Sequence, residues 1–245
     1  MRYFFKQNQF IDNQIILNEY EYHYLSRVKR LKAGDPFEFV IKQTLFIAEV
    51  LSFKTNYLKV EILRSNKVDN NEIELVLFQS IIKEQAFSTV LSTCTQLGVS
   101  KFIPVITHRS IVKINPNDFE KKRIRWEKIL TRSSSQSFQD IESSMGNVLS
   151  ISDFLKTFTF KNFDILVVPW EEELSNSLQT VLDKYNKNNI KRVGVFIGPE
   201  GGLTKNEIDL LKEKEFKSVS LGKHILKSES AGFYTLAQIK YFLNI

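Results

Sequence analysis

The spacing of apolar residues changes near residue 70. Before it, turn-forming residues separate three short strand-like runs, which span residues 36–41, 45–53 and 57–63. A helix is predicted to begin after Asn18, because Glu21 completes a capping pattern there. These elements predict a small β-barrel with one helix in residues 1–70, followed by a polar linker over residues 67–71.

From residue 71 to residue 245, short apolar strands alternate with longer helical patterns. Strands are predicted over residues 73–81, 101–106, 165–168, 193–197 and 218–221, and helices over 84–97, 118–138, 174–185, 207–214 and 229–243. This alternation predicts an α/β domain with a mainly parallel sheet that helices cover on both faces. The periodicity itself gives no sign of a knot, and knots are rare among folds.

Composition restricts the classes of protein that fit. No apolar run approaches the roughly 18 residues that a membrane span requires. The first residues lack the apolar core of a signal peptide, so we expect a cytoplasmic protein without a membrane partner. The one cysteine, Cys94, excludes an internal disulfide and a multi-cysteine metal cluster, and we predict no metal. Cys94 lies in an apolar helical stretch, which favours a buried, inert thiol over a nucleophile.

Positive charge is clustered along the chain. Lysine and arginine number 34 against 28 acidic residues, a net charge of +6. One cluster comprises His23, Arg27, Lys29, Arg30 and Lys32; another, on a predicted helix, comprises Lys121, Lys122, Arg123, Arg125, Lys128 and Arg132. Clustered cations with interleaved aromatic residues are typical of nucleic-acid binding, but a solvated helix face has the same pattern. Charge alone leaves both interpretations open.

The segment from Ile197 to Gly202 reads Ile-Gly-Pro-Glu-Gly-Gly and carries the first chemical signal. It follows a predicted strand and precedes Thr204 and Glu207, which form a capping box that opens a helix. Glycines allow positive φ and let a flat ligand approach the backbone, and the proline stiffens the turn. The spacing fits neither the dinucleotide nor the phosphate-loop motif. A purely structural turn is the alternative.

A second segment, Leu221 to Ala231, reads Leu-Gly-Lys-His-Ile-Leu-Lys-Ser-Glu-Ser-Ala and follows the next predicted strand. Together, the two segments resemble the signatures of the SPOUT methyltransferases that methylate N3 of a uridine in 16S ribosomal RNA of the small subunit. The first segment matches that family at every position. In the second, Lys227 replaces an arginine and Ser230 replaces a threonine.

The resemblance implies a SPOUT α/β domain with a deep C-terminal trefoil knot, and a PUA-like RNA-binding β-barrel before it. It also implies S-adenosylmethionine as cofactor, ribosomal RNA as substrate and a homodimer. The cofactor would lie against Val168, Pro169, Ile197, Gly198, Pro199, Gly202, Leu221, Gly222, Ile225 and Leu226, and the RNA against Arg27, Lys29, Arg30 and Arg109.

Two residues of the second segment are the catalytic candidates. Uridine N3 bears a hydrogen that it must lose, so a base or a stabilising cation is needed. Glu229 would accept the proton or fix a neighbouring cation, and Lys227 would stabilise the developing negative oxygen. Glu229 at a helix start is equally consistent with a capping role. His224 is more typical of a structural residue than of a catalytic one.

Departures from the family pattern leave the substrate open. Thr93, Ser135 and Gln139 stand where the family usually carries charged residues. The chain could therefore methylate a different nucleotide, or it could be an RNA-binding factor that lacks catalysis. The intact glycine segments argue against the last alternative. For the dimer, the final helix carries apolar residues on more than one face, although complete burial within one subunit would explain them too.

Overall fold

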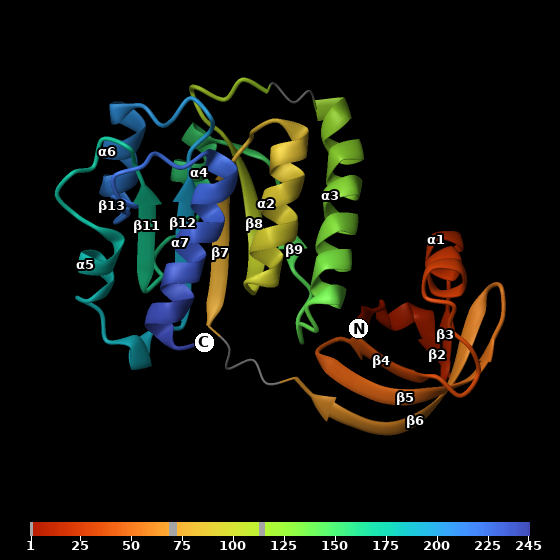
Figure 1. Ribbon diagram of the computed structural model, residues 1–245. Coiled ribbons are helices and arrows are strands. Elements are labelled where there is room, and N and C mark those ends of the chain that lie inside the picture. The colour runs from red at the N-terminus through yellow and green to blue at the C-terminus, as the bar shows by residue number, and fades with distance from the viewer. Residues whose placement is uncertain (1, 69–72, 113–115) are drawn as a thin grey trace. The chain divides into compact units, whose positions relative to one another are not determined.

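A computed structural model describes residues 2–68, 73–112 and 116–245 (Figure 1). The chain forms two compact units. The first comprises Met1–Asn70 with Ser134–Glu142, and the second comprises Asn71–Ser133 with Ser143–Ile245. The predicted boundary at residue 70, and most of the predicted linker over 67–71, lie outside the described residues.

The first unit is built on one curved sheet with the strand order β1-β4-β5-β6-β3-β2. Its strands are β1 (Arg2–Phe4), β2 (Phe10–Ile11), β3 (Gln14–Ile16), β4 (Pro36–Ile41), β5 (Thr44–Phe53) and β6 (Tyr57–Lys67). All pairings are antiparallel except that of β1 with β4. The sheet closes over a core in which Phe37, Phe39 and Leu58 are fully buried. The three predicted strands are confirmed as β4, β5 and β6.

The helix predicted after Asn18 is also confirmed. It is α1 (Glu19–His23), and its capping box is complete: Glu21 N donates to the Asn18 side chain, and Asn18 N donates to the Glu21 carboxylate. A short 3-10 helix, η1 (Gln7–Gln9), precedes it, and a π-helix, η2 (Tyr24–Val28), continues it. The turn ends at Arg30, whose φ of 53° lies in the left-handed region.

The second unit contains a seven-stranded sheet of order β10-β8-β7-β12-β11-β13, with β9 paired to β8. Its strands are β7 (Glu74–Ser80), β8 (Val99–Ile106), β9 (Ser144–Met145), β10 (Leu149–Ser150), β11 (Ile165–Pro169), β12 (Arg192–Ile197) and β13 (Lys217–Val219). Every pairing is parallel, which confirms the predicted sheet. Parallel strands are buried on both faces, and this explains their nearly continuous apolar sequences.

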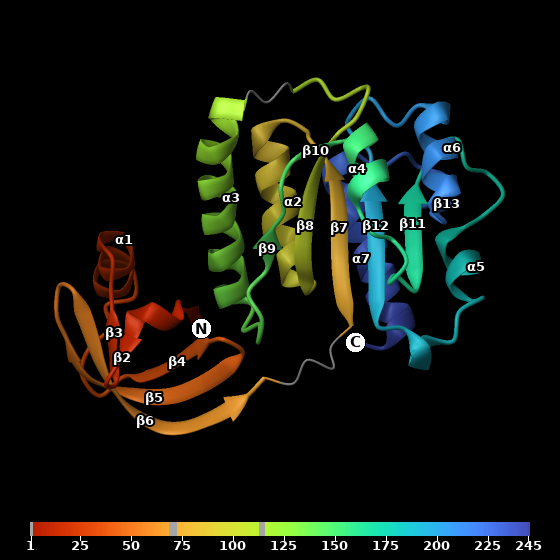
Figure 2. The ribbon, with the colours of Figure 1, turned by 180° about the vertical axis from the view of Figure 1, so that it is seen from behind.

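Helices cover both faces of this sheet (Figures 1 and 2). Side chains alternate along β7, so Leu75 and Leu77 face one apolar cluster while Val76 and Phe78 face the other. The first cluster is completed by α2 (Glu84–Gln96), α3 (Pro116–Gln136), α5 (Leu178–Leu182) and α7 (Ser228–Leu243), and the second by α4 (Ile151–Thr157) and α6 (Lys205–Glu213). A further 3-10 helix is η3 (Lys187–Asn189).

The helices of the structure differ from the predicted ones in two ways. The helix predicted over 174–185 is reduced to α5, because the Glu173 carboxylate binds the backbone N–H groups of Ser175 and Asn176 and holds the preceding residues in a loop. The short helix α4 was not predicted from the apolar pattern. Within the described part of the chain, no helix combines the length and the apolar character needed to cross a membrane.

Cys94 gives a direct test of the packing of the second unit. It is fully buried in α2, and this burial raises the pKa of its thiol to about 12. We expect iodoacetamide at about pH 8 to leave the native thiol unmodified, because the thiolate is the reactive form. Mass spectrometry should detect one modified cysteine only after denaturation. Modification of the native protein at the rate of the denatured chain would contradict this packing.

Candidate active site

The loops that follow β11, β12 and β13 surround a pocket of ≈ 800 Å³ in the second unit. Because these strands are parallel, their carboxyl ends lie at the same edge of the sheet, where ligands of open α/β sheets bind. The walls are residues 169–171, 173–174, 197–203, 220–229 and 231, together with Lys83 and Ala86 from the start of α2. The pocket therefore unites both sequence segments that carried the family resemblance.

The glycine segment forms a tight turn at the end of β12. Gly202 N donates to Pro199 O at 3.0 Å, and Gly202 has a φ of 71°, which a residue with a Cβ adopts only with strain. A Cβ at this position would also fall against the Glu171 carboxylate. The predicted capping box follows: Thr204 and Glu207 bond reciprocally at the start of α6. The direction of the chain leaving the turn is thereby fixed.

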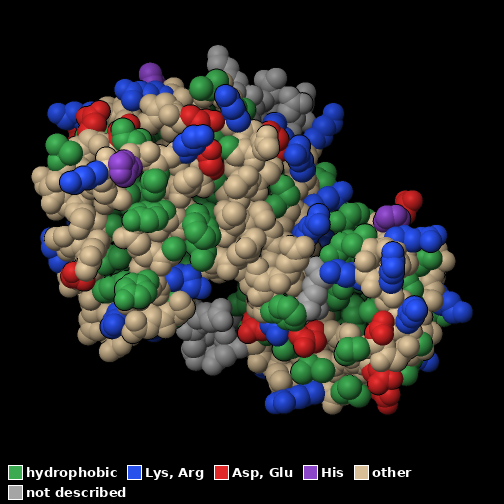
Figure 3. Space-filling view, in the orientation of Figure 1, with side chains coloured by type: hydrophobic (Ala, Val, Ile, Leu, Met, Phe, Trp, Pro, Cys, Tyr) green, Lys and Arg blue, Asp and Glu red, His purple; other side chains and the backbone are tan. Residues whose placement is uncertain are grey.

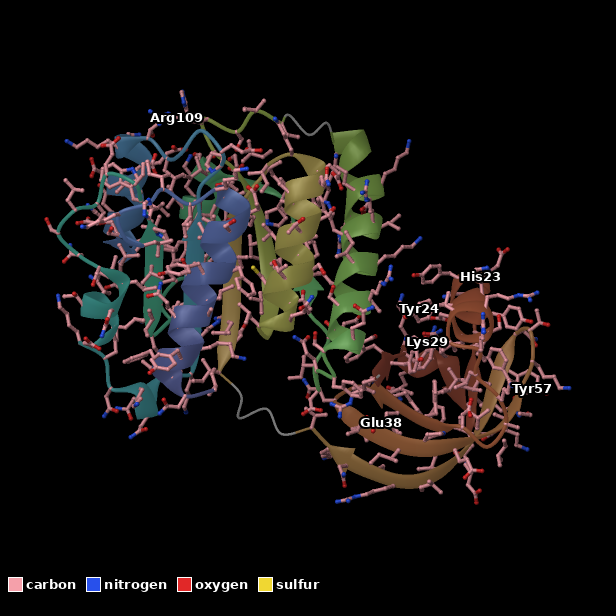
Figure 4. The ribbon with its side chains drawn as sticks, in the orientation of Figure 1. His23, Tyr24, Lys29, Glu38, Tyr57 and Arg109 are labelled. Atoms are coloured by element: carbon pink, nitrogen blue, oxygen red, sulfur yellow. The ribbon has the colours of Figure 1, made fainter. Side chains whose placement is uncertain are left out.

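Three contacts from distant parts of the chain hold this turn. The Ser228 hydroxyl, at the start of α7, donates to Gly198 O at 2.5 Å. Lys83 N donates to the Glu200 carboxylate at 3.0 Å, and Arg109 Nη1 donates to Gly201 O at 3.1 Å. Arg109 is thus placed against the glycine segment (Figure 4).

The Ser228 hydroxyl is held in turn by Gln79. The Gln79 amide nitrogen donates to Ser228 Oγ at 3.1 Å and to Ser80 O at 3.0 Å. Gln79 is fully buried near the end of β7. Removing its side-chain amide from water costs free energy, which the hydrogen bonds of the amide nitrogen offset in part. The chain from Gln79 through Ser228 to Gly198 joins β7, α7 and the glycine turn.

The second segment is anchored to the loop that follows β11. Ser220 N donates to Asn176 O at 2.7 Å, and Leu178 N donates to Ser220 O at 3.1 Å. Gly222 has a φ of 116°, and a Cβ there would meet no atom within 4 Å. The backbone at Gly222 is therefore open to a ligand from the pocket.

Glu173 organises the loop after β11, and the sequence pattern did not identify it. Its carboxylate accepts hydrogen bonds from the Ser218 hydroxyl and from the backbone N–H groups of Ser175 and Asn176. The Ser218 bond is the main cause that lowers the pKa of Glu173, with help from the two backbone bonds and the charge of Lys212. The only sequence signal was an acidic run directly after a strand, which is common at a surface.

The predicted site residues are distributed over four places, of which the position of Arg109 against the glycine turn is one. Pro169, Ile197, Gly198, Pro199, Gly202, Leu221, Gly222, Ile225, Leu226, Lys227 and Glu229 all line the pocket. Val168, by contrast, is fully buried in the core beneath it, so its side chain is not part of the wall. Arg27, Lys29 and Arg30 are exposed in the first unit.

Part of the second basic cluster has a structural role. Lys122 and Arg125 on α3 form ion pairs with Glu84, and the Trp126 indole donates to the same carboxylate at 3.2 Å. Arg123 pairs with Glu127 one turn further along α3. The contacts with Glu84 hold α3 against the start of α2. Part of the positive charge of α3 is therefore paired and not available to a ligand.

The pocket combines apolar walls with charged side chains from the loops after β11, β12 and β13. Trp170 lines it, and the Trp170 indole nitrogen is buried without a hydrogen-bond partner among the described residues. Lys227 is exposed and Glu229 half-buried at the start of α7, where the helix N-terminus adds positive potential. Such a pocket suits a flat ring that packs against backbone, with a charged group at the reacting end.

Comparisons with known proteins converge on one family. A family model described as RNA methyltransferase domain matches residues 69–240. The chain is 28% identical over 240 residues to the ribosomal RNA small subunit methyltransferase E 2 of Borreliella burgdorferi, covering 97% of this chain and 95% of that protein. It is 28% identical over 230 residues to the ribosomal RNA small subunit methyltransferase E of Bacillus subtilis, covering 90% and 87%.

A solved structure extends the likeness to the whole fold. The ribosomal RNA small subunit methyltransferase E of Neisseria gonorrhoeae, bound to S-adenosyl methionine, superposes with a TM-score of 0.82. That match covers 98% of this chain and 96% of the other at 22% sequence identity. The predicted α/β fold, with a smaller β unit before it, is therefore confirmed over nearly the full length.

The Glu173 contacts generate a pH-dependent prediction. The pKa of Glu173 is lower in the folded protein than in the unfolded chain. The ionised carboxylate therefore stabilises the fold at a pH above the unfolded-state pKa, and this stabilisation is lost as the pH falls through the folded-state pKa. We expect Glu173→Gln to lower the free energy of unfolding at pH 7 by about 1–3 kcal/mol. Urea unfolding should show this difference shrinking on acidification.

Glu172→Gln is the matched control, because Glu172 is an exposed neighbour with the same charge. It should leave the unfolding free energy nearly unchanged. A Glu173→Gln effect that is independent of pH would contradict the proposed role of the carboxylate charge.

Proposed function

Because the chain belongs to the RNA methyltransferase domain family, we propose that it transfers a methyl group from S-adenosylmethionine to N3 of a uridine in small-subunit ribosomal RNA. The observation that carries the proposal is the pocket in which both glycine segments meet. The relatives from Borreliella burgdorferi and Bacillus subtilis, which are named as small-subunit ribosomal RNA methyltransferases, support the class of RNA. The choice of uridine N3 comes from the motif resemblance.

The pocket fits the cofactor in size and chemistry. A volume of ≈ 800 Å³ lies within the range of roughly 300–1,000 Å³ that is typical of small-molecule sites. Gly222 presents bare backbone, and Ile197, Leu221 and Leu226 give apolar walls for an adenine ring. The Neisseria gonorrhoeae structure, which has the same fold, was solved with this cofactor.

Lys227 and Glu229 are the proposed catalytic residues. When bound, S-adenosylmethionine supplies an electrophilic methyl carbon and a neutral sulfur leaving group. The chain's own task is to hold uridine N3 in line and to remove its proton. Glu229 accepts that proton, and the Lys227 ammonium stabilises the negative charge that develops on the uridine oxygen. Both side chains start from the first turn of α7, which keeps them in fixed relation to the glycine turn through Ser228.

Each of the two units has its own residues that we propose to contact RNA. Arg27, Lys29 and Arg30 are exposed and close together in sequence at the end of α1 and η2, as phosphate-binding cations must be. Arg109 already donates one hydrogen bond to Gly201 O, so its remaining N–H groups are the ones that would meet a phosphate. Its proposed role couples substrate RNA to the cofactor turn.

The reaction itself can be tested in cells. We expect ribosomal RNA from cells lacking the gene to lose one N3-methyluridine, detected by mass spectrometry of nuclease digests. Expression of the wild-type chain should restore it, and Gly202→Val should not, because the valine imposes strain at positive φ where the cofactor binds. Calorimetry should show loss of S-adenosylmethionine binding by the variant.

The control is Lys227→Ala, which should bind the cofactor but fail to restore the modification. A restored modification with Gly202→Val would contradict the cofactor placement. An RNA unchanged by loss of the gene, or altered at another nucleotide, would contradict the proposed substrate.

A homodimer is proposed from one face of α7. Phe233, Tyr234 and Tyr241 are exposed there, with Tyr241 87% accessible, and Figure 3 shows hydrophobic side chains over this helix. Leu174 and Ile225 on the neighbouring pocket loops are 92% and 80% exposed. Exposed apolar residues gathered beside a functional pocket favour a second copy of the chain as their cover.

Light scattering at micromolar concentration should give twice the chain mass of 28.6 kDa. Tyr241→Glu should shift the protein toward the monomer, because it places a charge in the apolar contact. Leu63→Glu changes an exposed apolar residue of the first unit and serves as the control. A wild-type mass near 28.6 kDa would contradict the dimer.

The trefoil knot stays a prediction. The backbone bonds between Ser220 and the residues Asn176 and Leu178 bring the segment after β13 against the loop after β11, an arrangement that a knot would require.

A further inference from the structure

The first unit exposes aromatic rings among its cations at the end of α1 and η2. This aromatic-basic surface comprises Tyr20, His23, Tyr24, Arg27, Lys29 and Arg30. Tyr20 is 54% exposed, and its ring stacks on that of Tyr24 with centroids 6.3 Å apart and planes 12° from parallel. Lys29 Nζ lies 5.8 Å from the Tyr24 ring centroid. Figure 4 labels His23, Tyr24 and Lys29 at this end of the unit.

Tyr20 and Tyr22 lie on the same helix but differ in their packing. Tyr22 stacks on Phe53 at 5.5 Å and packs against the apolar core of the unit. Tyr20 lies on the outer side of the same helix, where a large exposed ring contributes little to the core. A tyrosine side chain combines a flat apolar ring with a polar tip.

The cations around the rings are exposed as well. The exposed cations are His23, Arg27, Lys29 and Arg30. Figure 3 shows Lys, Arg and His side chains near α1. The backbone between them includes the π-helix η2, a form that is rare and frequent at functional sites. Rings that stack and cations that bind phosphate are the two components of sites for unpaired nucleotides.

We propose that the aromatic-basic surface binds an unpaired RNA nucleotide, stacking its base on Tyr20 and holding the flanking phosphates with Arg27, Lys29 and Arg30. The proposal rests on the proposed function for the RNA substrate and adds its structural class: a single-stranded loop or end rather than a duplex. In a duplex the bases are stacked on one another, so a protein meets mainly phosphate and sugar. Tyr20 would then have nothing to stack on.

The structure supplies separate variants for the two components. Tyr20→Ala removes the ring, and Tyr20→Trp keeps a stacking surface. Arg30→Gly removes a cation without disturbing the turn, because Arg30 has a φ of 53° that glycine adopts without strain. Lys59→Ala removes one exposed cation from β6 in the same unit and is the charge control.

Fluorescence anisotropy of the full chain would compare an end-labelled single-stranded RNA with a duplex of the same length. We expect the single strand to bind more tightly, and Tyr20→Ala to weaken it roughly 5- to 150-fold while the duplex changes less than about twofold. Tyr20→Trp should restore the affinity. Arg30→Gly should weaken both RNAs and lower the salt slope for the single strand by about 0.7, whereas Lys59→Ala should change neither RNA as much.

Thermal unfolding of each variant would check that the fold is retained. Equal losses on single strand and duplex with Tyr20→Ala, no loss at all, or failure of Tyr20→Trp to restore binding would each overturn the proposal. So would a wild-type preference for the duplex. The binding measurement needs no methyl donor, so its outcome does not depend on methyl transfer. If the protein methylates RNA but the Tyr20→Ala variant binds RNA as the wild type does, the result contradicts the stacking proposal and leaves the proposed function intact.

Discussion

One buried hydrogen-bond chain ties the candidate active site to the sheet. Gln79 at the end of β7 donates to the Ser228 hydroxyl, and Ser228 donates to Gly198 O in the glycine turn. The same serine begins α7; Lys227 directly precedes it as the N-cap residue, and Glu229 directly follows it. A shift of this chain would move the turn and both candidate catalytic residues together. Gln79 is fully buried near the end of β7, and its hydrogen bonds fix this arrangement.

The pocket depends on a second constraint, the parallel direction of β11, β12 and β13. Parallel pairing places the three following loops at one edge, where backbone groups of different loops can face one ligand. Glu173 then joins the loop after β11 to Ser218 within β13, and Ser220 joins the same loop to the segment after β13. Each loop is thus held by another loop and by the sheet, which is the rigidity that methyl transfer at near-attack distance requires.

The two units contribute different chemistry. The second unit provides a pocket that combines apolar walls and backbone groups with charged side chains, as a site for a charged small molecule requires. The first provides an exposed surface of cations and rings on a short helix, as an extended polymer requires. Charge along the sequence did not separate these roles. In the second unit, Lys122, Arg123 and Arg125 are held in ion pairs with acidic neighbours, so the basic helix α3 is partly a structural element.

The sequence by itself determined the parts of the fold whose signals are local. The arrangement of apolar residues predicted β4 to β8, β11 and β12, and α2, α3 and α7 to within a few residues, because burial imposes a helical spacing on helices and short continuous apolar runs on parallel strands. The capping boxes at Asn18 and Thr204 were visible because both partners lie three residues apart. The two glycine segments predicted the family, which the match over residues 69–240 confirms.

Only the tertiary structure decided the rest, because the partners are distant in sequence. Nothing local links Gln79 to Ser228, Arg109 to Gly201 or Glu173 to Ser218. The strands β1 to β3 contain two or three residues each, too few to show a period. Val168 was predicted to form part of the pocket wall because it lies with Pro169 at the end of a strand, but side chains alternate along a strand and its own is buried in the core. The sequence therefore determined which segments form the site, and packing determined which side chains reach it.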